Sequence, residues 1–120
     1  MEIYWKNRKI EAGTLLQVEE RGSEVLDEDG RPVVVTWRIL EIRSRGEGDD
    51  YYEPKSGKTY SMQKVMKRRR LRKKKLAGQL VAIPACSDYL VLREYRGGED
   101  AGLRCFSVDM LGLLWDVKVF

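Results

Sequence analysis

The side chains with the clearest capacity for chemistry form one cationic run, which reads KVMKRRRLRKKKL at positions 64–76. Nine of the twelve positions from 64 to 75 hold Lys or Arg, and no acidic residue interrupts them. Cations at this density attract polyanions, and a nucleic-acid backbone is a polyanion that several Lys and Arg side chains can neutralise together. The candidate contacts are Lys64, Lys67, Arg68, Arg69, Arg70, Arg72, Lys73, Lys74 and Lys75.

Three kinds of anion could balance this charge. The first is the phosphate backbone of DNA or RNA, whose contacts give affinity with little sequence preference. The second is an acidic surface on a partner protein. In that case the chain would be a small regulator or inhibitor, of the kind that a phage or mobile element directs at a nucleic-acid enzyme. The third is the protein's own acid, for example the carboxylates of residues 47–53, or simply solvent around a charged face. We expect nucleic acid and keep the acidic protein partner as the alternative.

A second candidate surface lies on a predicted hairpin of residues 89–96 and 102–109. Its outer face would hold Tyr89, Arg93 and Tyr95, while the two leucines of the first strand face the core. Tyrosines that flank an arginine suit the stacking of nucleic-acid bases on a sheet. The same side chains could instead cover a second layer of the fold.

The register of this hairpin makes two further predictions. If residues 97–101 form the loop, Glu94 faces Arg104, which is a favourable cross-strand pair. The same register places Cys105 opposite Arg93 and far from Cys86. We therefore expect two free thiols and no disulfide.

Other motifs give weaker indications of chemistry. Asp116-Val117-Lys118, with Asp109 upstream, resembles the acid-x-Lys pattern of restriction-type nucleases, in which carboxylates bind Mg²⁺. A Mg²⁺-dependent nuclease is therefore a second alternative. SGKT at positions 56–59 resembles part of a phosphate-binding loop, but Tyr52 stands where that motif needs Gly. A turn with Gly57 at positive φ explains these residues.

Composition excludes several classes of enzyme. The chain has no His, which removes His-based triads, His-ligated zinc and His proton shuttles. Its two Cys are too few for a zinc site built from Cys alone. We expect a protein that is not an enzyme and needs no cofactor.

The distribution of charge isolates the cationic run. Residues 1–63 hold ten basic and thirteen acidic side chains, and residues 76–120 hold four basic and six acidic ones. The chain is therefore a mildly acidic body that carries one strongly cationic element. No apolar run approaches the roughly 18 residues that span a membrane, and the opening residues do not resemble a secretory signal. We expect a cytoplasmic protein with no membrane contact.

The elements that must position these residues are mainly strands. Strands are predicted near 14–20 and 32–44, with a small hairpin around Asn7 and four short strands after residue 78. Between them, a basic helix is predicted over about 62–77, with Ser61 as its N-cap and Gly78 after its end.

The predicted helix has an unusual apolar stripe. On a helical wheel two basic residues interrupt the stripe, and Leu71 points to the opposite side. We therefore expect the helix to dock by its ends and its middle to project.

This order of elements predicts a single domain, residues 1–120, of the α+β class and mostly β. An antiparallel sheet or a small β-barrel would carry the one basic α-helix. A helix between a third and a fourth strand is also the order found in oligonucleotide-binding barrels.

Overall fold

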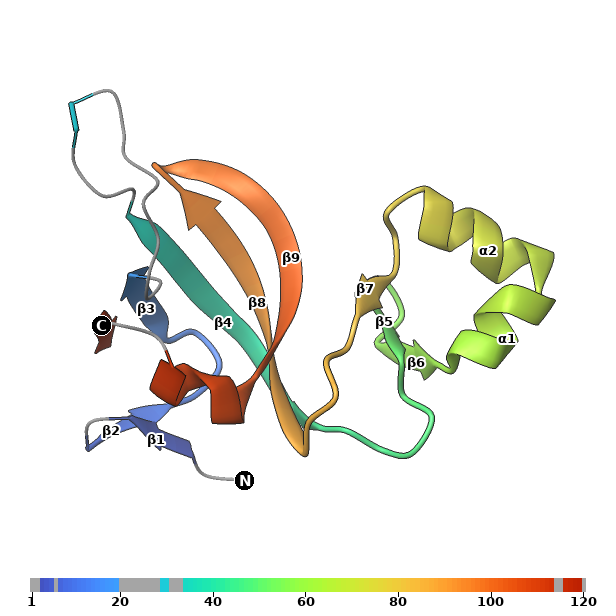
Figure 1. Ribbon diagram of the computed structural model, residues 1–120, viewed down its shortest axis with the longest axis horizontal. Helices are drawn as coiled ribbons and strands as arrows, with labels where there is room; N and C mark the ends of the chain where they lie inside the picture. Colours follow the sequence, from blue (N-terminus) through green and yellow to red (C-terminus); the bar gives the residue numbers. More distant parts are fainter. Residues whose placement is uncertain (1–2, 6, 20–28, 31–33, 114–115, 120) are drawn as a thin grey trace.

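The computed structural model describes residues 3–5, 7–19, 29–30, 34–113 and 116–119. For residues 19, 112, 113 and 116–119 it describes the backbone alone. The chain forms two unequal parts, which we call the body and the arm (Figure 1). The body comprises the described residues up to 44 and from 88 onward, and the arm comprises residues 45–87. No helix in the described part of the chain is long and apolar enough to cross a membrane.

The body is built on a five-stranded antiparallel sheet in the order β10-β3-β4-β8-β9. A separate hairpin, β1–β2, turns at Asn7, whose φ of 65° confirms the predicted turn. A 3₁₀ helix, η1, follows β9. The elements of the body are β1 (Ile3–Trp5), β2 (Arg8–Ile10), β3 (Leu15–Glu19), β4 (Val35–Ser44), β8 (Asp88–Arg96), β9 (Glu99–Ser107), η1 (Val108–Leu113) and β10 (Asp116–Val119).

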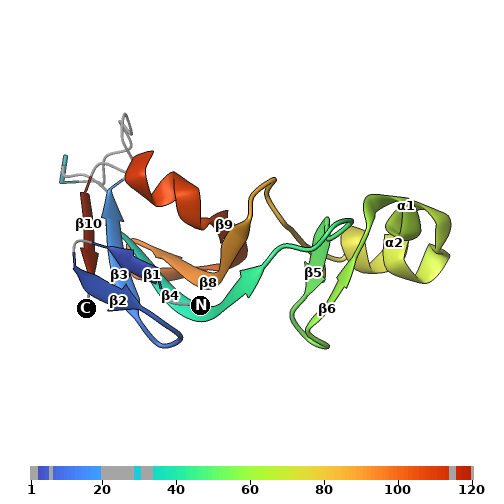
Figure 2. The ribbon, with the colours of Figure 1, turned by 90° about the horizontal axis from the view of Figure 1, so that it is seen from below.

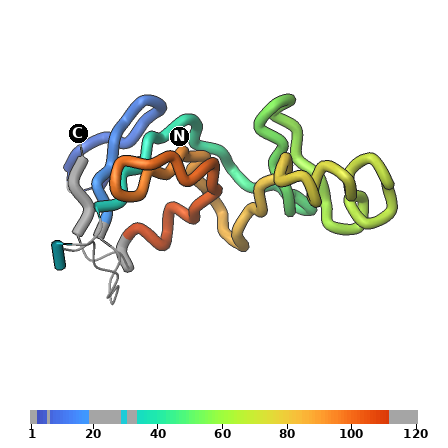
Figure 3. Tube along the Cα trace, turned by 90° about the horizontal axis from the view of Figure 1, so that it is seen from above, coloured from blue at the N-terminus to red at the C-terminus, as the bar shows by residue number. Residues whose placement is uncertain are grey.

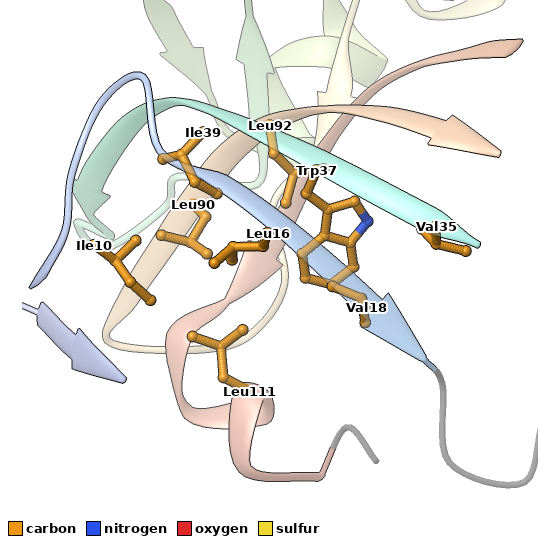
Figure 4. Packing of buried hydrophobic residues seen from close by; sticks show 9 residues of the cluster. All are labelled: Ile10, Leu16, Val18, Val35, Trp37, Ile39, Leu90, Leu92 and Leu111. Carbon is orange, nitrogen blue, oxygen red and sulfur yellow. The ribbon is translucent and has the colours of Figure 1, made fainter. Parts of the chain in front are cut away.

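The core of the body comes from strand alternation. Val35, Trp37 and Ile39 of β4 are buried on one face of the sheet, as the period of two predicts. They pack with Leu90 and Leu92 of β8 and with side chains from β2, β3 and η1 (Figure 4). This apolar face fixes the register of β4, because a slip by one residue would turn it away from the core.

The β8–β9 hairpin forms, but not with the predicted loop. Gly97 and Gly98 both have positive φ and close a two-residue turn, and a bulge follows between Glu94 and Tyr95. Glu94 therefore pairs with Gly102, and the predicted register is wrong by two positions.

From Tyr89 to Glu94 the shift of two positions keeps each side chain on its predicted face. Arg104 consequently still reaches Glu94 along the strand, with 3.5 Å between Nη1 and Oε1. Cys105 lies opposite Val91 and not opposite Arg93, and both cysteines are free, as predicted.

The arm has its own small antiparallel sheet, in the order β6-β5-β7, and two short helices (Figure 1). The fold class is thus confirmed as α+β, mostly β and antiparallel, while the described strands form no closed barrel. The elements of the arm are β5 (Tyr51–Glu53), β6 (Lys58–Tyr60), α1 (Met62–Lys67), α2 (Arg69–Leu76) and β7 (Val81–Ala82).

The single predicted helix is wrong, because the chain breaks at Arg68. Arg68 has an extended backbone, with φ −101° and ψ 116°, and separates α1 from α2. Val65 and Leu71 would lie about 120° apart around one continuous helix. With the break, both side chains are buried in one apolar cluster that also holds Tyr51, Tyr60 and Leu80.

Both predicted ends of the helical segment are confirmed. The Ser61 hydroxyl accepts from the backbone N–H of Lys64 at 3.1 Å. At the other end, Gly78 has a φ of 72°, and the N–H groups of Gly78 and Gln79 donate to the carbonyls of Lys75 and Lys74. These bonds form a Schellman motif, which stops the helix.

Candidate nucleic-acid interface

The cationic run occupies α1, Arg68 and α2 at the end of the arm that lies farthest from the body (Figures 1 and 2). Eight of its nine basic residues are exposed, and Lys74 is half-buried. The break at Arg68 turns Leu71 toward the arm's core, so the helices dock through their middle. The middle of the helical segment was expected to project from the body of the protein, and this is wrong at Leu71. The basic side chains around Leu71 do project into solvent.

One cation is neutralised inside the arm. Lys74 Nζ lies 2.6 Å from Glu53 Oε2, and only 5% of the Glu53 side chain is exposed. Ser56 also donates its hydroxyl to Glu53. The hydrogen bond from Lys74, then that from Ser56 and the nearby charge of Arg70 lower the pKa of Glu53 against the opposing effect of burial.

Three more cations have weaker partners within the arm. Arg72 Nη1 donates to the carbonyl of Met66 at 2.9 Å, which satisfies a free carbonyl at the end of α1. Lys64 and Lys75 lie over tyrosine rings, at 5.7 Å and 5.3 Å from the ring centres. Among the described residues, no ion pair or side-chain hydrogen bond engages the remaining five, which are Lys67, Arg68, Arg69, Arg70 and Lys73.

The acids of the loop before β5 mostly organise the arm itself. Asp50 accepts from the N–H of Met62 at 2.7 Å and from Arg45 at 3.1 Å, and so holds the start of α1. Asp49 accepts from the Thr59 hydroxyl at 2.7 Å. This bond, more than the nearby guanidinium charges, lowers the pKa of Asp49. These carboxylates therefore leave most of the cationic run uncompensated.

A cleft of about 390 Å³ opens between β6 and the two helices. Its lining contains five cationic side chains and no carboxylate. The hydroxyl of Thr59, the ring of Tyr60 and the buried Leu71 complete its walls, together with Gly57. The cations of the cleft are Arg43, Lys58, Lys64, Arg68 and Arg70.

Two of these cations were not predicted from the sequence. Arg43 lies on β4, far from the cationic run, and nothing in its local sequence marks it. Lys58 lies in SGKT, where Gly57 has a φ of 73° and forms a turn, as expected. The resemblance of SGKT to part of a phosphate-binding loop was the only feature of the sequence that pointed to Lys58.

The predicted surface on the hairpin is not assembled. Tyr89 is completely buried, so its ring cannot stack on a base. Arg93 pairs with Asp100 at 2.8 Å, and Tyr95 is half-buried. The end of β8 that holds Arg93 and Tyr95 lies far from α1 and α2 (Figures 1 and 2). Tyr89 therefore packs against a second layer of the fold. This is the alternative to a stacking surface that the sequence left open.

The nuclease motif is only partly visible. Asp109 is exposed on η1, while Asp116 and Lys118 lie on β10, whose side chains are outside the described part of the structure. Elsewhere in the described chain, no three His, Cys, Asp or Glu residues gather closely enough to hold a metal ion.

The geometry thus places eight exposed cations on the helical segment of the arm and a cationic cleft beside them. Comparison with other proteins adds no assignment. No protein-family model, curated protein or solved structure matches this chain.

Proposed function

We propose that the protein binds nucleic acid through the exposed surface of α1, Arg68 and α2, without catalysing a reaction. The observation that carries this proposal is the set of five basic side chains that form no ion pair or side-chain hydrogen bond among the described residues. They lie within a segment of seven residues, so they can contact neighbouring phosphates at the same time. Contacts to phosphates release counterions, which supplies affinity for any sequence.

Repulsion within the helices supports an external anion. Arg69 and Lys73 of α2 are four residues apart and carry like charges, as do Arg70 and Lys74. Each such pair costs a few tenths of a kcal/mol on an isolated helix, about as much as an opposite pair would contribute. Of these four side chains, only Lys74 forms an ion pair with a carboxylate in the described part of the chain. A bound polyanion would relieve the remaining repulsion.

The salt dependence of binding tests this function. The affinity for single-stranded DNA or RNA should fall steeply between low and moderate salt, with a logarithmic slope of about −0.7 per phosphate contacted. A triple variant with Lys67, Arg69 and Lys73 changed to Gln should lose three contacts. Its slope should therefore be smaller by about 2. Fluorescence anisotropy against salt concentration measures both quantities.

The matched control changes Arg8, Lys9 and Arg38 of the body to Gln, which alters the net charge of the protein equally. This control should bind almost as the wild type does. A wild-type affinity that does not change with salt would contradict the proposal, as would equal losses in the two triple variants.

A second candidate function is docking on an acidic protein surface. It is favoured by three exposed apolar side chains beside the cations, namely Met62, Met66 and Leu76, which are 50%, 62% and 88% exposed. Apolar side chains beside cations suit a protein groove better than a phosphate backbone. Recovery of one protein partner after nuclease treatment, with no nucleic acid retained, would favour this candidate over the first.

A further inference from the structure

The cleft between β6 and the helices is chemically distinct from the helical surface around it. It is concave, and its volume of about 390 Å³ falls in the range of about 300–1,000 Å³ typical of small-molecule sites. Its cations come from three separate elements: Arg43 from β4, Lys58 from β6, and the others from the helical segment. Side chains that converge from separate elements surround a ligand, whereas those along one helix contact it from one side.

The charges in the cleft are not all free. Arg43 pairs with Glu41 at 3.0 Å and stacks over the ring of Tyr52. Lys64 lies over Tyr60. In the described part of the chain, Lys58, Arg68 and Arg70 have no carboxylate partner at hydrogen-bonding distance.

Three free cations, with two more close by, exceed the single negative charge of a phosphodiester. A terminal phosphate monoester carries about −1.5 to −2 at neutral pH and offers three oxygens as acceptors. Arginines can bind two of those oxygens at once, and a lysine adds a point charge. The volume also leaves room for the adjoining sugar.

We propose that this cleft binds the terminal phosphate monoester of a nucleic-acid strand. Lys58, Arg68 and Arg70 would contact its oxygens, while the rest of the strand follows the helical surface. This inference rests on the proposed function, because it assigns the cleft to one end of a bound strand.

The experiment compares three labelled single strands by fluorescence anisotropy. One has about 12 nucleotides and a terminal phosphate, prepared in 5′ and 3′ versions. The second has the same sequence and hydroxyl ends. The third also has hydroxyl ends but is two nucleotides longer, so its total charge matches that of the phosphorylated strand. We expect one phosphorylated version to bind about tenfold more tightly than either hydroxyl strand, the effect of about one charge-assisted hydrogen bond.

Two variants separate the cleft from the helical surface. Lys58→Gln, which is exposed and outside the helices, should reduce the preference for the phosphorylated strand to less than about twofold. It should leave the affinity for hydroxyl strands almost unchanged, and Lys58→Arg should keep the preference. Lys73→Gln, which is on α2 but outside the cleft lining, should weaken all strands alike and keep the preference.

The outcomes distinguish this inference from the proposed function. If hydroxyl strands bind but a terminal phosphate adds nothing beyond the charge-matched strand, the cleft inference is overturned and the proposed function stands. A preference that survives in Lys58→Gln also overturns it. If adenosine monophosphate binds more tightly than the phosphorylated strand, the cleft is a site for free nucleotides and the inference is wrong. If no strand binds, both proposals fall together.

Discussion

At the scale of single residues, Glu53 is the acid that most constrains the cationic run. It is buried at 5% exposure of its side chain, and it accepts from both Lys74 and Ser56. A buried carboxylate without such partners would carry a large desolvation cost. Glu53 therefore fixes Lys74 to the small sheet and orients α2, and Lys74 is the basic residue of α2 least available to a ligand.

Replacing Glu53 tests this role. Glu53→Gln should reduce the free energy of unfolding by about 1–3 kcal/mol at neutral pH, because a buried charged partner of Lys74 is lost. Urea denaturation measures the change. Glu47→Gln is a suitable control, since Glu47 is exposed in the same loop, and should change stability by less than about 0.5 kcal/mol.

The pH dependence of Glu53→Gln adds a second readout. Since folding lowers the pKa of Glu53 from its ordinary 4.5, its contribution is complete above pH 4.5 and is lost as the pH falls through the lowered pKa. The stability difference between wild type and Glu53→Gln should therefore shrink below pH 4.5. A difference that stays constant down to pH 2 would contradict the pairing.

At the scale of elements, the break at Arg68 determines which side chains hold the helices. A continuous helix would separate Val65 from Leu71, and only the break places both in the arm's core. Leu76 lies at the end of α2 and is 88% exposed. Two leucines five residues apart thus have opposite environments.

This contrast provides a matched pair of variants. Leu71→Ala should cost about 2–5 kcal/mol of unfolding free energy, because it empties a site in the core. Leu76→Ala makes the same chemical change on the surface and should cost less than about 0.5 kcal/mol. Equal effects in urea denaturation would contradict the broken helix.

Local patterns predicted much of the fold but not this break. Strand alternation, the Ser61 cap and the Gly78 stop are all encoded within a few neighbouring residues, and each was predicted correctly. The break depends on distant partners, because Tyr51 and Leu80 supply the apolar surface that Val65 and Leu71 share. Among the site residues, the exposure of the cationic run could be predicted, because a segment with so many charged side chains cannot be buried. Arg43 could not be predicted, since only tertiary structure brings it to the cleft.

At the scale of the whole molecule, a third apolar cluster joins the arm to the body. It contains Tyr52 of β5, Ile83, and Tyr89, Val91 and Cys105 of the body. Together with Cys86 and Val81, these side chains pack the small sheet against the outer face of β8 and β9. The cluster explains why Tyr89 is buried and why the hairpin presents no stacking surface.

The rate at which the Cys105 thiol is alkylated measures how often the junction between arm and body opens. Burial raises the pKa of its thiol to about 12, and the side chain is 6% exposed. Alkylation requires the thiolate, so Cys105 should react at neutral pH only when the arm separates from the body or the chain unfolds. Mass spectrometry should show Cys86, which is half-buried, reacting faster, and both residues should react at equal rates in urea. Equal rates without denaturant would contradict the packing.

The path of the chain between body and arm has a consequence for how such a protein can diversify. Ser44 and Asp88 face each other across β4 and β8, and the Ser44 hydroxyl donates to the Asp88 carboxylate at 3.1 Å. The chain leaves the body for the arm and returns beside its point of exit, so the whole arm is an insertion between two antiparallel strands of the body (Figure 3). The entropy of closing such a connection grows only slowly with its length. Changes of length in the distal helices can therefore accumulate without altering the register of the body's sheet.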